Sequence, residues 1–266
     1  MVQKNIQLKK EMEDLIMSNT TIANTNIANR EVCDLIFVDY ASKKPFLNLD
    51  FANVSTTELT GESVFAYGGK GHPKRVQFAG EKGGTLTIET QIQSVKLWQL
   101  ITGGEIDATA QFVTRTEKDV DSAGTVITLD DTPVENSVVV YAYDDDCGKE
   151  LAHTVSDKTI TLSTAVTGGS KVIVYYMRKL TEKVQRLNIK SETFPKNFIV
   201  YGDTVMKAED NTDTILPYKF IAYKAAPQSN MSLSFSNNGD PAALTITCDL
   251  MADSDNNILD LILMEE

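Results

Sequence analysis

The stretch TLTIET, residues 85–90, alternates strictly between polar and large apolar side chains. Successive side chains of a β-strand point to opposite faces of its sheet, so this alternation predicts a strand with one buried face. Leu86 and Ile88 are the expected core residues, whereas Thr85, Thr87 and Glu89 are expected on the opposite face. The stretch therefore predicts a β-sheet that keeps one face small, polar and acidic.

Two later stretches repeat this pattern, MSLSFS at 231–236 and LTITCDL at 244–250. Their polar positions hold Ser, Thr and Asp, and neither stretch contains Lys or Arg. Two interpretations stay open, an ordinary solvent-facing sheet and the smooth, negatively charged wall of a channel. The candidate wall residues are Thr85, Thr87, Glu89, Ser232, Ser234, Thr245, Thr247 and Asp249.

Before the first of these strands lies the glycine-rich and basic stretch GGKGHPKRVQFAGEKGG, residues 68–84. Glycine and lysine together suggest either a phosphate-binding loop or turns between strands. The stretch lacks the GxxxxGK[ST] pattern and opens no evident helix, which argues against a phosphate site. We interpret its glycines as turns that let Val76–Phe78 and Thr85–Thr90 enter a sheet.

Further apolar runs predict strands on both sides of this region, at 35–38, 45–49, 198–201, 219–223 and 243–250. A short helix is expected over 94–101, with Ser94 as its N-cap and the pair Gly103-Gly104 ending it. Residues 258–264 form a final helix or strand. Residues 3–18 carry apolar side chains at helical spacing, which predicts an amphipathic helix packed either on a neighbouring molecule or on its own domain.

Residues 115–180 read as a separate module of short strands divided by turn clusters, which is typical of a small Ig-like β-sandwich. We expect strands at 126–129, 138–143, 159–162 and 171–176. The whole chain is therefore predicted to be mainly β with short helices. Its expected divisions are an N-terminal arm over 1–30, a β domain over 31–114 and 181–266, and the inserted domain over 115–180.

Composition excludes several function classes. The 266 residues carry a net charge of −12, which argues against a protein that wraps nucleic acid. No HExxH or GxSxG pattern occurs, the calcium-like run at 253–257 lacks its glycine and its glutamate, and no cofactor, metal site or enzyme activity is expected. Cys33, Cys147 and Cys248 are expected to be buried free thiols, and neither a signal peptide nor a membrane span is recognisable.

Three segments together resemble a known family: GGKGHPKRVQFAGEKGGTLTIETQ, SVKLWQLITGG and SFSNNGDPAALTITCDLMADSDNNIL. They are similar to the tail tube (major tail) proteins of tailed bacteriophages, and the likeness covers roughly residues 31–112 and 182–266. The resemblance implies a tail-tube-type β-sandwich or barrel. It also implies homohexameric rings that stack head to tail into a hollow tube of the virion tail, assembled in the cytoplasm of the bacterial host.

In such a tube, double-stranded DNA passes through the lumen without specific binding. Glu89 and Asp249 are then candidate lumen acids. The basic Lys70, Lys74 and Arg75, together with the N-terminal arm, are candidates for contacts between rings, where the basic side chains meet Asp253 and Asp255 of the next subunit.

Other implied partners are the tape measure protein, the tail tip or baseplate, and a sheath in a contractile tail. Two alternatives stay open at this point. One is another virion part, a head-decoration or tail-terminator protein. The other is a surface-binding module, in which Tyr141, Tyr143, Tyr175 and Tyr176 of the insert would supply an aromatic platform.

Overall fold

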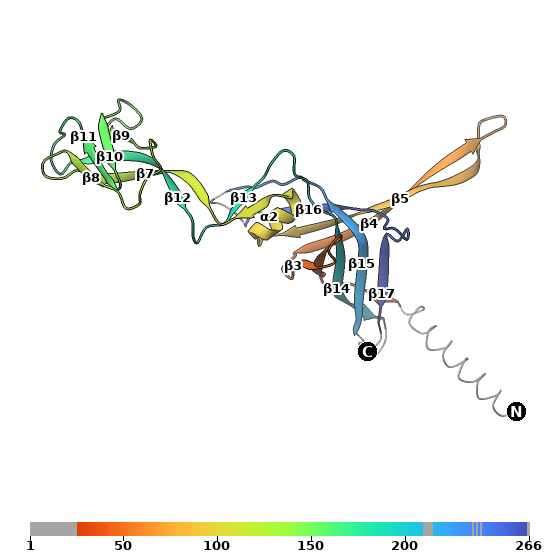
Figure 1. The fold of residues 1–266 in the computed structure, drawn as a ribbon. Coiled ribbons are helices and arrows are strands. Elements are labelled where there is room, and N and C mark those ends of the chain that lie inside the picture. The colour runs from red at the N-terminus through yellow and green to blue at the C-terminus, as the bar shows by residue number, and fades with distance from the viewer. Residues whose placement is uncertain (1–25, 210–214, 236, 238, 240, 265–266) are drawn as a thin grey trace, which may run out of the picture. The chain divides into compact units, whose positions relative to one another are not determined.

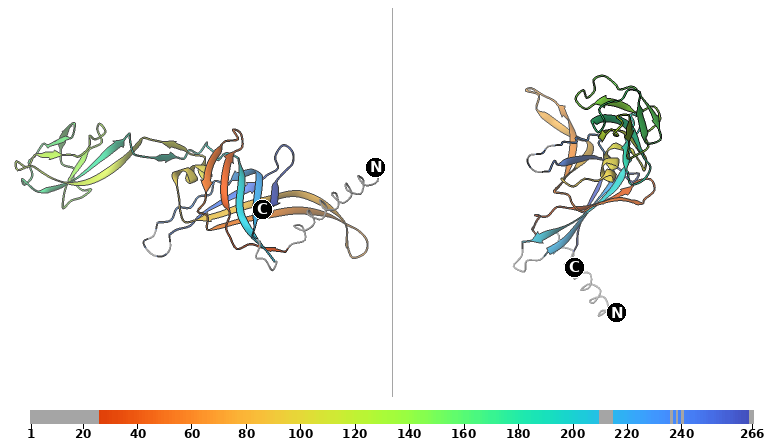
Figure 2. Two further views of the ribbon diagram at one scale, coloured as in Figure 1. Left: turned by 90° about the horizontal axis from the view of Figure 1, so that it is seen from below. Right: turned by 90° about the vertical axis from the view of Figure 1, so that its left-hand side faces the viewer.

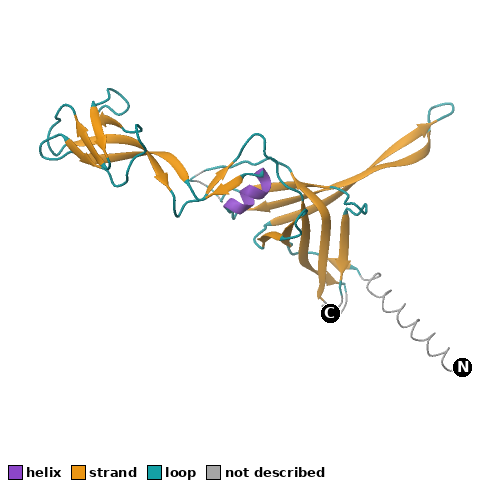
Figure 3. Cartoon of the chain, viewed as in Figure 1, coloured by secondary structure: helices purple, strands orange, loops and turns teal. Residues whose placement is uncertain are grey.

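The computed structural model describes residues 26–209, 215–235, 237, 239 and 241–264. Strands make up 53% of the structure and helices 3%, so the prediction of a mainly β protein is confirmed (Figures 1 and 3). The chain divides into two compact units, Met1–Gly104 with Ile189–Glu266 and Glu105–Asn188. The expected helix at 3–18 lies outside the described residues, as does most of the expected arm at 1–30.

The first unit is built on one antiparallel, nine-stranded sheet in the order β3-β2-β14-β15-β16-β5-β4, with β1 paired to β14 and β17 to β15. Its described strands form no closed barrel. The strands are β1 (Ile27–Ala28), β2 (Asp34–Asp39), β3 (Pro45–Leu49), β4 (Val54–Tyr67), β5 (Lys74–Thr90), β14 (Phe198–Ala208), β15 (Ile215–Pro227), β16 (Leu244–Leu250) and β17 (Leu259–Leu263).

The core of this unit lies where the apolar faces of these strands meet helix α2 (Val95–Thr102). As expected, Leu86 and Ile88 are fully buried. The predicted ends of the helix are also confirmed. The Oγ of Ser94 accepts a hydrogen bond from the Leu97 N–H at 3.1 Å, and Gly103 adopts φ 70° and donates its N–H to Gln99 O at 2.8 Å. These caps satisfy backbone groups that a short helix leaves unpaired.

Strands β4 and β5 form a hairpin that continues beyond the sheet as a two-stranded ribbon, visible in two orientations in Figure 2. Only the tip glycines serve a turn, with Gly69 and Gly71 at φ 88°. The prediction that the later glycines form turns is wrong, because Gly80 and Gly84 lie inside the 17-residue strand β5. At Gly84 a Cβ would stand 2.5 Å from the Glu58 carbonyl oxygen, so a side chain there would collide with β4.

Two other expectations concern the C-terminal part of this unit. Residues 258–264, left open between helix and strand, contain strand β17. The strand expected at 231–235 is absent, and these residues follow an irregular path between β15 and β16. Strand β16 pairs with β5 along its whole length, whereas β15 pairs only with its last residues, Cys248–Leu250, and residues 231–235 do not take up the rest of that edge.

The second unit contains two three-stranded antiparallel sheets, β10-β11-β8 and β7-β12-β9, and a small ribbon of β6 and β13. Residues of both three-stranded sheets share one core around Ile127, Val140, Ile160 and Val174. The unit is wider than the predicted insert, since its strand β7 already begins at Ala110. The bounds are β6 (Glu105–Asp107), β7 (Ala110–Asp119), β8 (Val126–Thr128), β9 (Val139–Ala142), β10 (His153–Ser156), β11 (Thr159–Leu162), β12 (Lys171–Leu180) and β13 (Arg186–Asn188).

The three thiols differ in burial, and the expectation that all are buried is wrong for Cys147, which is exposed. Burial raises the pKa of Cys248 to about 12 from an ordinary 9.0. An alkylating reagent at pH 8 should therefore modify Cys147 first and leave Cys248 unmodified until the first unit unfolds, as mass spectrometry of the modified peptides can establish. Rapid modification of Cys248 in the folded chain would contradict its burial.

The same thiol makes stability depend on pH. The pKa of Cys248 is higher in the folded than in the unfolded chain. Its contribution to the free energy of unfolding is therefore complete below about pH 9 and is lost as the pH rises from 9.0 towards 12.

Candidate functional site

The candidate site is the outer face of β16, β5 and β4, opposite the core. The strand register places Asp249 beside Thr85, Thr247 beside Thr87, and Thr245 beside Glu89. The residues between them, such as Leu86 and Ile246, are buried on the other face. The register thus brings six of the eight expected polar residues together, in three cross-strand pairs on one surface.

Strand β4 extends these pairs into rows that the sequence pattern did not predict. Glu58 lies opposite Thr85, Thr56 opposite Thr87, and Val54 opposite Glu89. In the β4 sequence VSTTEL both alternate sets contain polar residues, so its pattern did not distinguish the two faces. The pairing with β5 supplies the missing information, and it adds Glu58 to Glu89 and Asp249 as a third acid. We call these nine positions of β4, β5 and β16 the polar wall.

The two remaining candidates, Ser232 and Ser234, lie in the irregular segment before β16, and both are exposed. Ser232 lines a polar hollow of about 500 Å³ together with Thr245 and Thr247, so the segment reaches the edge of the polar wall. Ser234 does not line this hollow. The alternation in MSLSFS therefore identified one residue beside the wall although it predicted the wrong local structure.

Gln228 ties the start of that segment to the polar wall. Its Nε2 donates to the Asp249 Oδ1 at 2.9 Å, and its backbone N–H donates to the backbone carbonyl oxygen of Thr247 at 2.8 Å. The side-chain bond gives the Asp249 carboxylate an uncharged partner, because the glutamine amide carries no charge. None of the nine wall positions is a lysine or an arginine.

Beyond the polar wall, the ribbon formed by 59–82 of β4 and β5 leaves large apolar side chains exposed; we call it the hairpin arm. Val64 and Phe78 are directly opposite each other and are 65% and 58% exposed. Val76 is paired with Ala66 and is exposed as well. An isolated two-stranded hairpin is at best marginally stable in water, so apolar residues along it indicate a surface that packs on a partner.

The candidate contact residues at the arm tip are partly held by local interactions. The Lys74 Nζ lies 3.9 Å from the centre of the Phe65 ring, and the Arg75 Nε donates to the Gly68 carbonyl oxygen at 3.2 Å. Lys70 is exposed at the tip itself. These interactions stiffen the tip and leave its three positive charges at the solvent-facing end of the arm.

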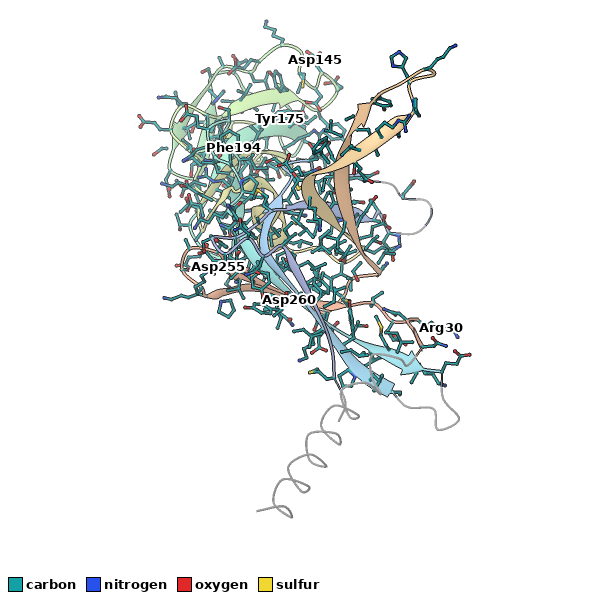
Figure 4. All side chains as sticks on the ribbon, turned by 90° about the vertical axis from the view of Figure 1, so that its right-hand side faces the viewer. Arg30, Asp145, Tyr175, Phe194, Asp255 and Asp260 are labelled. Atoms are coloured by element: carbon teal, nitrogen blue, oxygen red, sulfur yellow. The ribbon has the colours of Figure 1, made fainter. Side chains whose placement is uncertain are left out.

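Asp253 and Asp255, the expected acidic partners, lie between β16 and β17. The Asp253 Oδ1 accepts the backbone N–H of Asn257 at 2.8 Å and of Asp255 at 2.9 Å, and these bonds hold the pKa of Asp253 below its usual range. Asp255, labelled in Figure 4, is exposed. Among the described residues no ion pair joins either acid to the basic tip within one chain, so such a pair requires a second copy.

Two further kinds of site were sought in the parts of the chain that the structure describes. No cluster of three or more His, Cys, Asp or Glu side chains there could hold a metal ion. None of the described helices has the length and apolar character to cross a bilayer.

Comparison with known proteins places this arrangement in a family. The model of the YomU/Tube protein family matches residues 29–263, which include all the described strands of both units except β1. No curated protein matches the chain. Because the match covers most of the sequence and agrees with the resemblance to phage tail tube proteins seen in its strands, the chain belongs to the YomU/Tube protein family.

Proposed function

We propose that this structural protein polymerises as homohexameric rings, which stack into a hollow tail tube with an acidic lumen through which DNA is ejected. The observation that carries the proposal is the polar wall, where three adjacent strands hold three acids, five threonines and one valine and no basic residue. Like charge keeps DNA phosphates away from such a wall, and the absent Lys and Arg are the residues that bind them. The family assignment supports the same reading.

The edge of the sheet suggests how a ring closes. Strand β4 stands at the end of the sheet order, and within the described chain only β5 pairs with it over its 14 residues. A long open edge is a template for pairing with another chain, and closure into a barrel removes it. We infer that neighbouring subunits join their sheets along this edge, so that their polar walls line one continuous lumen.

The hairpin arm suggests how rings stack. A head-to-tail contact between different surfaces can repeat without closing, which produces a filament. The arm supplies exposed apolar side chains along its length and positive charge at its tip, while Asp253 and Asp255 supply negative charge elsewhere on the subunit. We assign the contact between rings to these groups, with Lys70, Lys74 and Arg75 of one copy meeting the two acids of another.

Substitution of the wall acids tests the proposal. Virions whose tube carries Glu58→Gln, Glu89→Gln and Asp249→Asn should assemble normally but release their DNA more slowly, because the phosphates lose the repulsion that keeps them off the wall. Release can be followed by the fluorescence of an intercalating dye after ejection is triggered. Tube length and diameter, measured by electron microscopy, should not change.

A matched control removes the same charge elsewhere, with Asp50→Asn, Glu182→Gln and Glu192→Gln at exposed positions outside the polar wall. Its DNA release should equal that of the unmodified virion. Equal release from the wall variant and the control would show that the polar wall does not face the DNA.

The second unit is proposed to be an Ig-like addition to the tube domain. Tyr176 is buried and Tyr175 donates its hydroxyl hydrogen to Asp146 at 3.0 Å, so two of the four tyrosines of the expected aromatic platform serve the unit's own structure. Assembled in the host cytoplasm, the tube would meet the tape measure protein, the tail tip or baseplate and, in a contractile tail, the sheath.

A further inference from the structure

The first unit contains an apolar groove of about 260 Å³ that the proposed tube function does not use. It lies between the base of the hairpin arm and the inner face of β14, β15 and β17, and its walls include Cys33, Leu59, Met206, Tyr218 and Leu261. None of the residues that line it is charged. In a chain with a net charge of −12, a groove lined without any charged side chain is suited to an apolar occupant.

Two leucines at the mouth of the groove remain open to solvent. Leu59 of β4 is 59% exposed and Leu261 of β17 is 61% exposed, on the inner face of their strands. Cys33 and Tyr218, which also line the groove, are half-buried, and burial raises the pKa of both the Cys33 thiol and the Tyr218 hydroxyl. Covering two such leucines removes apolar surface from water, which favours the covered state.

The first described residues of the chain lie at the rim of this groove. Strand β1 pairs with Lys207 and Ala208 at the end of β14, and Asn29, which follows β1, is one of the groove residues. The 25 residues that precede Asn26 are therefore attached beside the groove. Their sequence carries Leu8, Met12, Leu15 and Ile16 at the spacing predicted for one face of a helix.

The connection is long enough for this segment to reach back. The residues between Met17 and Asn26 span up to about 26–29 Å when extended. A segment on such a tether experiences an effective concentration in the millimolar range, so its own chain has the advantage over a second molecule in dilute solution.

We propose that the groove is the docking site for the N-terminal segment of the same chain, with the apolar side chains of residues 8–16 covering Leu59 and Leu261. A short amphipathic helix is marginal in water by itself and requires an apolar surface to pack on. The groove supplies that surface within reach of the tether. This docking takes place within one subunit, so it can be tested in the monomer.

Disulfide cross-linking of the full chain tests the proposal. In a chain with Cys33→Ser and Cys147→Ser, Leu261→Cys is combined in turn with Leu8→Cys, Met12→Cys or Leu15→Cys and oxidised at low protein concentration. At least one pair should form a disulfide within the monomer, seen on a non-reducing gel as a faster-migrating band. Lys10→Cys, on the opposite face of the expected helix, is the matched control and should cross-link about tenfold more slowly.

Other outcomes of the cross-linking would contradict the proposal. Cross-links only between chains would assign the groove to a segment of a second copy. Equal rates for Lys10→Cys and the apolar positions, or no cross-link at any of them, would overturn the docking altogether. Substituting residues 8–15 alters none of the described contacts, so circular dichroism should show an unchanged fold in every variant.

A second measurement uses the native Cys33 of the groove as the reporter. Leu8→Asp with Leu15→Asp should speed the alkylation of Cys33 about tenfold, because the covering segment is released. Cys147, in the other unit, should react at an unchanged rate and serves as the internal control. An unaltered Cys33 rate would mean that the segment does not cover the groove. Neither result depends on whether rings or tubes form, so the outcome is separate from that of the proposed function.

Discussion

Replacing Val64 and Phe78 with aspartate should abolish tube polymerisation while the subunit stays folded. Both side chains belong to the hairpin arm, are mostly exposed in the single chain, and lie outside the buried core cluster. Burying each of them in a contact between rings contributes about 1.5–3 kcal/mol. Losing both weakens each contact by about 3–6 kcal/mol, which corresponds to a factor of about 10² to 10⁴ in affinity.

The measurement is negative-stain electron microscopy combined with sedimentation at matched protein concentration. The unmodified chain should form tubes, and the double variant should remain as subunits or single rings with an unchanged circular dichroism spectrum. The control carries the same two types of substitution at other exposed sites, Val113→Asp with Phe235→Asp. Tubes of normal length from the arm variant would show that the hairpin arm does not contribute to the contact between rings.

The second large effect concerns the core of the first unit, where Phe37→Ala should lower the free energy of unfolding by about 3–5 kcal/mol. Phe37 is fully buried, and its ring meets that of Phe198 edge-on with 6.0 Å between centroids, while Phe46 packs on the other side of Phe198. Alanine leaves a cavity among side chains that strands β2 and β14 hold in place. Such strands cannot collapse into the space without losing their ladder.

Trp98 makes this measurement specific. It is the chain's single tryptophan and packs against the core of the first unit, so its fluorescence reports on that unit alone during urea unfolding. Phe235→Ala, at a side chain that is 92% exposed, is the matched control and should change stability by less than about 0.5 kcal/mol. A loss below about 1 kcal/mol for Phe37→Ala would argue against the packing described for this core.

The second unit should not respond to Phe37→Ala, since its own strands enclose a separate core around Ile160 and Val174. Far-ultraviolet circular dichroism follows all strands and should then show part of the signal unfolding at the unmodified midpoint. A single transition shifted as a whole would mean that the two cores unfold as one.

Two strands of the polar wall, β5 and β16, could be predicted there because each alternates polar and apolar residues over a buried core. TLTIET and LTITCDL are predicted correctly for this reason, and so is the helix between Ser94 and Gly103, whose caps are explicit in the sequence. MSLSFS carries the same alternation but forms no strand, although β15 pairs with β16 only at Cys248–Leu250. Alternation shows which face of a segment could be buried, and it does not show whether the segment pairs with a neighbouring strand.

The hairpin arm escaped prediction for the opposite reason. Glycines and charged residues are poor strand formers, and a ribbon exposed on both faces has no buried side to impose a two-residue period. Glu58 was missed as a wall acid on the same grounds, since its place on the wall follows from its pairing with Thr85. The sequence pattern therefore identifies residues that pack in the core of their own chain more clearly than residues that would contact another copy.

Strand β5 runs without interruption from Lys74 at the arm tip to Glu89 on the polar wall. Between them the register with β4 shifts opposite Gly61–Ser63, and glycines stand at 80, 83 and 84. The hairpin should therefore bend most easily near the middle of β5, at these glycines. In the proposed tube, bending between neighbouring rings would be taken up at these glycines, and the polar wall would keep its shape.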